Sequence, residues 1–247
     1  MAQNFYEAFA SFYDAWLSSD PTSDALIKEY THRIQQEAQD TTIVYLGIAT
    51  GRIAVELMQN TQHHFIGIDY AKNMLTLAQK RLNEAKLSAR CTLLHQDILK
   101  LTIASRQNLF ILPLRTLGHF ISIEDKKSAL CSIYKAMKRG EKLIFDMEHF
   151  NEANAKVIDG KHQNSYYDEA SALVLYNKFS FDFKTQIVNI DVYKARLKEE
   201  QLEDLKQFRY QYSWISPSQQ RAVLEEVGFK NIELLQDSPY QLWQVVK

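Results

Sequence analysis

Two kinds of apolar pattern alternate along the first 150 positions of the chain. Short apolar runs at 43–47, 65–69, 92–95, 109–112 and 142–147 have the length and composition of buried strands. In the segments 24–34, 53–58, 74–82 and 124–138, apolar residues instead recur every three or four positions, as on one face of a helix. Strands that alternate with helices predict an α/β fold with a doubly wound parallel sheet, covered on both faces.

The helical spacing disappears after about residue 165. Three stretches at 171–182, 187–197 and 207–214 alternate polar and apolar positions and predict an antiparallel meander. The charged run 198–206 is interpreted as a solvated loop or a short helix. A capped helix ending at Gly228 and strands at 231–236 and 241–246 then return to the main sheet. We therefore expect a single domain over 1–247 with an antiparallel β insert at 165–214.

Composition narrows the class of partner. The 247 residues include 29 Lys and Arg against 30 Asp and Glu, so the net charge of −1 argues against nucleic-acid and membrane-surface binding. Two distant cysteines, Cys91 and Cys131, supply neither a disulfide framework nor a metal-binding pair. The N-terminus lacks a leader pattern, and no run has the roughly 18 to 20 apolar residues of a membrane span. These features predict a soluble, cytoplasmic protein with a small-molecule partner and no metal; a homodimer is compatible with them.

Candidate chemistry lies where the predicted strands end. The turn after the first strand contains Gly47 and Gly51, and Asp69 ends the second strand 22 residues after Gly47. A glycine turn lets a ligand approach the backbone, and a carboxylate at the end of the second strand can accept hydrogen bonds from both hydroxyls of a ribose. Asp97 follows the third strand. The alternative is that these are unrelated loop residues, but parallel strands bring all of them to one crevice.

The segments VYLGIATGR, FIGIDYAKNML and LLHQDILKL resemble the first three motifs of the class I S-adenosylmethionine-dependent methyltransferases. The resemblance extends over nearly the whole chain. It implies a seven-stranded Rossmann-like sheet in the order 3-2-1-4-5-7-6, with an antiparallel last strand, and S-adenosylmethionine as the cofactor. Three places depart from the usual pattern: Tyr45 stands where an acidic residue is common, Ala49 replaces the second glycine, and RGE at 139–141 replaces PGG before the fifth strand.

The resemblance also assigns roles to single residues. In the first motif, which includes Arg52, it places the backbone of the turn near the methionine part of the cofactor, and it places the second and third motifs around the ribose and adenine. The residues so assigned are Gly47, Ala49, Gly51 and Arg52, then Asp69 for the ribose, Tyr70 and Met74 beside the adenine, and Asp97 with Ile98 at the adenine edge.

Two further segments resemble small-molecule methyltransferases, including sugar-amine N-methyltransferases. FYDAWL aligns Tyr13 with a tyrosine that closes over the cofactor and reaches the acceptor, and LRTLGHF aligns His119 with a histidine that faces the acceptor, with Arg115 nearby. A histidine with a pKa near 6.5 suits proton removal, and a tyrosine hydroxyl suits orientation. The competing interpretations are core packing for Tyr13, a structural hydrogen bond for His119 and a surface ion pair for Arg115.

The sequence thus predicts an S-adenosylmethionine-dependent methyltransferase that acts on an amine or hydroxyl of a small metabolite, with His119 and Tyr13 as catalytic residues and Arg115 and His119 at the acceptor. The alternative is a methyltransferase-fold cyclase or binding protein that does not transfer methyl. The departure at Tyr45 keeps that alternative open, because a phenol cannot pair with the cofactor's ammonium as a carboxylate does.

Overall fold

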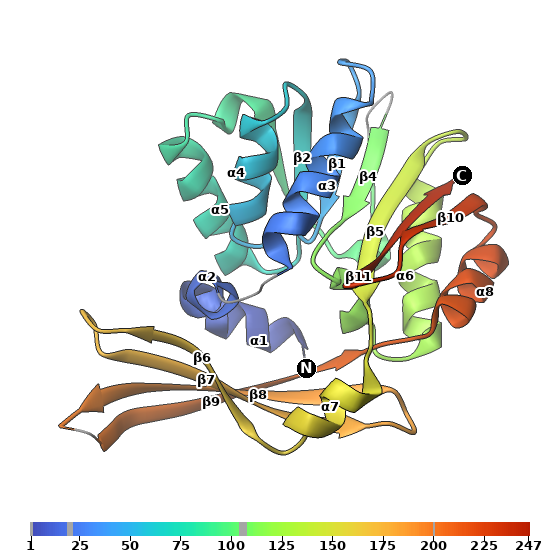
Figure 1. Cartoon of the computed structure of the whole chain (residues 1–247). Helices are drawn as coiled ribbons and strands as arrows, with labels where there is room; N and C mark the ends of the chain where they lie inside the picture. Colours follow the sequence, from blue (N-terminus) through green and yellow to red (C-terminus); the bar gives the residue numbers. More distant parts are fainter. Residues whose placement is uncertain (1, 19–21, 104–107, 200) are drawn as a thin grey trace.

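A seven-stranded sheet forms the centre of the molecule in the computed structural model, which describes residues 2–18, 22–103, 108–199 and 201–247 (Figure 1). The strand order is β3-β2-β1-β4-β5-β11-β10, with β11 antiparallel to its neighbours β5 and β10 and all other adjacent pairs parallel. Counted within this sheet, the order is 3-2-1-4-5-7-6, so the predicted topology is confirmed. The strands are β1 (Thr42–Leu46), β2 (His64–Asp69), β3 (Cys91–His95), β4 (Asn108–Leu112), β5 (Lys142–Glu148), β10 (Lys230–Gln236) and β11 (Tyr240–Val246).

Helices cover both faces of this sheet. One face packs against α3 (Ser23–Gln35), α4 (Arg52–Gln59) and α5 (Lys72–Glu84), and the other against α6 (Ile123–Ala136) and α8 (Pro217–Val227) (Figure 1). Strand β1 shows why both faces are covered: Ile43 and Tyr45 enter the first core, while Val44 and Leu46 enter the second. In the described part of the chain, no helix combines the length and apolar character needed to cross a membrane.

A second, four-stranded antiparallel sheet lies beside the carboxyl ends of the parallel strands (Figure 1). Its strands are β6 (His162–Asp168), β7 (Leu173–Asp182), β8 (Ile187–Lys198) and β9 (Gln201–Ser213), and α7 (Glu152–Ile158) precedes them. The pattern missed β6 because its sequence lacks an apolar run. The single-domain organisation with an insert at 165–214 stays a prediction.

The interpretation of 198–206 as a loop or short helix is wrong for the residues that the structure describes there. Lys198 ends β8, and β9 begins at Gln201, so the charged run forms the tip of a long hairpin. Cross-strand pairing, such as Leu197 with Leu202, satisfies the backbone in this hairpin, while the side chains of 201–206 remain exposed. The charged residues therefore predicted the exposure of this segment correctly, but a charged segment can still form a strand.

The N-terminal helices α1 (Ala2–Phe9) and α2 (Tyr13–Leu17) lie between the two sheets (Figure 1). The carboxylate of Glu7 accepts hydrogen bonds from the backbone N–H groups of Lys72 (2.5 Å) and Asn73 (3.0 Å), at the start of α5. An acidic group there satisfies free N–H donors and complements the helix dipole. On the other side, Trp16 donates from Nε1 to Oδ1 of Asn177 on β7 (2.8 Å). The N-terminal segment is thus fastened to both sheets.

Candidate active site

The turn between β1 and α4 opens onto a first cavity of about 260 Å³ at the carboxyl ends of the parallel strands. Gly47 and Ala49 lie in this turn with φ angles of +73° and +49°. This left-handed conformation carries no steric cost for glycine, whereas Ala49 adopts it against its preference. Nine of the predicted site residues line the cavity: Tyr13, Gly47, Ala49, Asp69, Tyr70, Met74, Asp97, Ile98 and His119.

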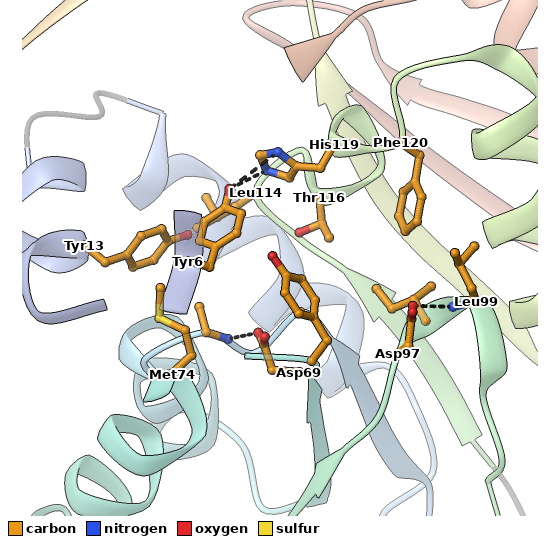
Figure 2. A pocket seen from close by; sticks show the side chains of 14 residues that line it. Tyr6, Tyr13, Asp69, Met74, Asp97, Leu99, Leu114, Thr116, His119 and Phe120 are labelled. Carbon is orange, nitrogen blue, oxygen red and sulfur yellow. Dashed lines mark hydrogen bonds between the residues drawn. The ribbon is translucent and has the colours of Figure 1, made fainter. Parts of the chain in front are cut away.

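Asp69 ends β2 and is held by the backbone around the turn (Figure 2). Its Oδ2 accepts a hydrogen bond from the N–H of Ala49 (2.8 Å), and its Oδ1 accepts one from the N–H of Ala71 (2.9 Å). Burial raises the pKa of this carboxyl, whose residue is only 8% exposed, although these bonds act in the opposite direction. The backbone N–H of Tyr70 is a third donor to this carboxyl, so the oriented carboxylate keeps one acceptor position for a ligand in the cavity.

Asp97 has a partner within the chain as well. Its Oδ1 accepts a hydrogen bond from the N–H of Leu99 (2.9 Å) and caps the short 3-10 helix η3 (Ile98–Lys100) (Figure 2). Ile98 itself is buried and forms part of the same cavity wall. The carboxylate of Asp97 therefore fixes the position of this wall besides facing the cavity.

Gly51 and Arg52 do not line the first cavity. Gly51 has a φ angle of +74°, and a Cβ placed there would lie 3.2 Å from Cα and Cβ of Ala78 on α5, so turn conformation and helix packing both require glycine. Arg52 differs: its Nη2 is buried and has no hydrogen-bond partner among the described residues. Burial raises the pKa of Tyr13, and the positive charge of Arg52 lowers it by a smaller amount. The guanidinium therefore lies near that tyrosine. An unpaired buried donor of this kind suits an anionic ligand group.

His119 ends the 3-10 helix η4 (Thr116–His119), which follows β4. The hydroxyl of Tyr6 lies 2.9 Å from its Nε2, and Figure 2 shows the two side chains pointing toward each other. Burial, together with the positive charges of Lys126 and Arg115, lowers the pKa of His119 to about 4. The imidazole is therefore neutral at pH 7, which corrects the expectation of a histidine that titrates near 6.5.

Tyr6 is a site residue that the sequence interpretation missed. Both Tyr6 and Tyr13 line the first cavity, and burial raises the pKa of each phenol. Each follows a phenylalanine, in the pairs Phe5–Tyr6 and Phe12–Tyr13, and the pairs are seven residues apart. Because residues seven apart share a helix face, this repeated pair was a usable signal for a second tyrosine at the site.

A second cavity of about 260 Å³ adjoins the first. Four residues line both: Tyr6, Tyr13, Leu114 and His119. The remaining walls come mainly from α2, the end of β5 and the antiparallel sheet, with Trp16, Leu17, Arg115, Glu148, Asn177, Ile190, Tyr210 and Tyr212. Arg115 thus lies in the second cavity and not in the first, with its Nε 3.6 Å from Oε2 of Glu148. One wall consequently carries charges of both signs.

The turn that carries Arg115 has a strained backbone, which a buried carboxylate stabilises. Leu114 and Arg115 have φ angles of +55° and +56°, which side-chain-bearing residues rarely adopt. The fully buried carboxylate of Asp146 accepts hydrogen bonds from the N–H of Arg115 (2.8 Å) and the hydroxyl of Tyr30 (2.8 Å). Burial raises the pKa of Asp146 to about 6. Sequence reasoning missed Asp146, although a carboxylate inside the apolar run of β5 was its signal.

Tyr45 lines neither cavity. It is 2% exposed and packs in the core beneath α3 and α4. Burial raises the pKa of its phenol, with a further contribution from the neighbouring Tyr13, while Arg52 opposes both. The ring therefore fills the space at the end of β1, close to the side chains around the first cavity.

Comparisons with known proteins agree with this geometry. Residues 43–140 match the sequence model of a family described as a methyltransferase domain, and no curated protein sequence matches the chain. An S-adenosylmethionine-dependent methyltransferase from Clostridium acetobutylicum is 18% identical, with a TM-score of 0.75 over 98% of each chain. The CcbJ methyltransferase from Streptomyces caelestis is 15% identical, with a TM-score of 0.78 over 98% of this chain and 97% of the other. The sugar N-methyltransferase KedS8 from a Streptoalloteichus species is 12% identical, with a TM-score of 0.76 over 95% of this chain and 92% of the other. Residues 43–140 therefore resemble a methyltransferase domain in sequence, and the chain as a whole has the fold seen in S-adenosylmethionine-dependent methyltransferases.

Proposed function

We propose that this protein transfers a methyl group from S-adenosylmethionine to an amine or hydroxyl of a small molecule. The observation that carries the proposal is the pair of adjoining cavities with Tyr6, Tyr13, Leu114 and His119 as their common wall. Methyl transfer is an in-line displacement, so donor and acceptor must be held in contact and in alignment. The first cavity takes the cofactor and the second takes the acceptor.

The residues around the first cavity fit the proposed cofactor. Asp69 can accept a hydrogen bond from a ribose hydroxyl, because the backbone N–H groups of Ala49, Ala71 and Tyr70 leave one acceptor position of the carboxylate unused. Tyr70 and Met74 border the adenine. Arg52 does not line the cavity, so its buried and unpaired Nη2 would reach the cofactor's carboxylate only after its side chain moves. When bound, S-adenosylmethionine supplies a methyl group on a sulfonium that is already activated for displacement.

On the acceptor side, His119 and Tyr6 orient the reacting group. A neutral imidazole has one acceptor nitrogen, and the Tyr6 hydroxyl lies 2.9 Å from Nε2, so the oxygen of Tyr6, oriented by His119, is the group that accepts a hydrogen bond from an amine N–H or a hydroxyl of the acceptor. With its pKa lowered to about 4, His119 is a weak base. We therefore assign it a role in positioning the acceptor and not the role of general base. Two structures with this fold are described as a sugar N-methyltransferase and an amino pentose methyltransferase, which supports an amine acceptor.

Binding and turnover test the proposal separately. S-adenosylhomocysteine at about a hundred times its dissociation constant should stabilise the fold by roughly 2.7 kcal/mol, seen as a melting shift of about 5 to 10 °C. Incubation with S-adenosylmethionine and a panel of amino sugars should then release S-adenosylhomocysteine, detected by mass spectrometry. Binding without release for any amine or hydroxyl acceptor favours the non-transferring alternative. No binding at millimolar ligand overturns the proposed function and leaves a non-transferring protein that has lost the cofactor.

A further inference from the structure

A third cavity of about 260 Å³ lies between α7 and the antiparallel sheet. Its walls come from the segment after β5, from α7 and from strands β7, β8 and β9 with the residue that follows β9. The apolar residues among them are Phe150, Ala155, Ile158, Phe179, Phe181, Val188, Ile190, Tyr212 and Trp214. The polar residues of the lining are Glu148, His149, Asn151 and Asn154. A mainly apolar hollow with a few polar groups has the character of a ligand site.

This third cavity adjoins the second, and the two share one wall. Glu148, Ile190 and Tyr212 line both cavities. The Tyr212 ring lies against Gly118, where a Cβ would come within 2.1 Å of it, and edge-to-face against His119 at a centroid distance of 5.4 Å. Its hydroxyl is buried and has no side-chain partner among the described residues. One aromatic side chain thus stands between the reacting centre and the third cavity.

The walls favour a flat ring over a flexible chain. Phe150 stacks on Trp214 with a centroid distance of 3.9 Å and an interplanar angle of 12°. Phe181 lies 6.0 Å from Trp214 and 6.2 Å from Phe150, tilted to both. Aromatic rings at these separations present faces and edges for offset-stacked and edge-to-face contacts with a further ring.

We propose that the third cavity is a second compartment of the acceptor site, which holds a flat apolar ring of the same acceptor molecule whose amine or hydroxyl lies at His119. The inference rests on the proposed function for the placement of the reacting group. It deepens that function, because it makes the acceptor a two-part molecule, with a polar reacting end in the second cavity and an aromatic group beyond Tyr212.

A matched pair of variants on α7 tests the compartment. Ala155 is 4% exposed and lines the third cavity, whereas Ala153 on the same helix is exposed to solvent. The probe is 2-naphthylmethylamine, titrated by calorimetry into protein saturated with S-adenosylhomocysteine. Ala155→Leu should weaken probe binding by about tenfold or more, because the larger side chain occupies the space of the ring. Ala153→Leu should leave it unchanged, and equal affinities for the two variants overturn the proposal.

A measurement on the unaltered side chains covers the case in which Ala155→Leu fails to fold. The protein is labelled with 5-fluorotryptophan, and each tryptophan resonance is assigned by single replacement. Trp214 lines the third cavity, whereas Trp243 lies on β11 and is buried in the core of the seven-stranded sheet. The naphthyl probe should shift the Trp214 resonance and not that of Trp243, while methylamine, which has no ring, should shift neither. A Trp214 resonance that the naphthyl probe does not move contradicts the compartment.

The two proposals fail in different ways. If the parent protein does not bind S-adenosylhomocysteine, the proposed function is contradicted. Binding of the naphthyl probe is then measured without cofactor. Normal cofactor binding, combined with a probe affinity that Ala155→Leu does not change, contradicts the proposed compartment and leaves the proposed function intact.

Discussion

The hydroxyl of Tyr6 lies 2.9 Å from Nε2 of His119, although 113 positions separate the two residues in the chain. Tyr6 belongs to the first helix and His119 to the 3-10 turn after β4, so the contact closes the N-terminal segment over the carboxyl ends of the sheet. Both side chains line both adjoining cavities. The pair therefore stands where donor and acceptor must meet.

Replacing Tyr6 by phenylalanine should slow turnover without loosening the cofactor. Tyr6→Phe removes one hydrogen bond to His119, for which we expect a three- to tenfold loss in kcat/KM, roughly the worth of a neutral hydrogen bond. Calorimetry with S-adenosylhomocysteine should give an unchanged Kd. Tyr167→Phe, at a side chain that is 49% exposed, is the control. Equal losses in the two variants would mean that the contact has no specific role.

The burial of His119 should make the protein less stable in mild acid. Its pKa of about 4 in the fold lies below the usual 6.5, so between these values the unfolded chain binds more protons. The contribution of His119 to the free energy of unfolding should therefore fall as the pH drops from 6.5 to 4, by on the order of 3 kcal/mol. Urea denaturation of the parent and of His119→Gln at pH 7 and 4.5 measures this, and on going to pH 4.5 the parent should lose more stability than the variant. Equal changes in the two proteins would show that the imidazole is not perturbed.

Asp146 should act with the opposite sign. Its pKa of about 6 lies above the usual 3.8, so the fold binds more protons than the unfolded chain between these values. This residue's contribution to stability is fully present below pH 3.8 and declines, by on the order of 3 kcal/mol, as the pH rises to 6. Asp146→Asn should remove that decline when its unfolding free energy is compared with the parent's at pH 4 and 7. A pH slope identical to the parent's would show that the carboxyl is not perturbed.

Asp69→Ala should weaken S-adenosylhomocysteine binding by about 1.5 to 3 kcal/mol, the range for hydrogen bonds to a charged group. Because Asp69 also holds the N–H groups of Ala49 and Ala71, the melting temperature of the ligand-free variant must be measured beside its Kd. Asp40→Ala, at an exposed carboxylate, is the matched control. Affinities that are equal in variant and parent would remove Asp69 from the cofactor site.

Gly118→Ala should destabilise the protein by about 1 to 3 kcal/mol, the usual cost of overpacking. The added methyl group would lie 2.1 Å from the ring of Tyr212, too close for the ring to keep its place. Tyr212→Ala removes the ring and so relieves the clash. Gly118→Ala should therefore cost less stability when it is added to Tyr212→Ala than when it is added to the parent. Thermal melts of the two single variants and the double variant give this coupling, and strictly additive shifts would contradict the contact.

Local patterns were sufficient to predict the central sheet and one wall of the site. The apolar runs of β1 to β5 and the helical spacing between them span windows of a few residues, and the right-handed crossover rule converts their alternation into a parallel sheet. Asp69 and Asp97 follow from the same logic, because the ends of parallel strands meet at one edge. The pattern was less informative for β6 and the tip of the β8–β9 hairpin, where polar residues pair through the backbone alone.

The order of elements, the glycine turn after β1 and the acidic strand ends could thus be predicted from the chain, since each depends on residues close together in it. Three features could not: the contact of Tyr6 with His119, the support that Asp146 gives to the strained turn at Leu114 and Arg115, and the cavities between the two sheets. These features depend on packing between distant segments and on burial. Burial also sets the pKa of His119 near 4, a property that the residue type alone does not contain.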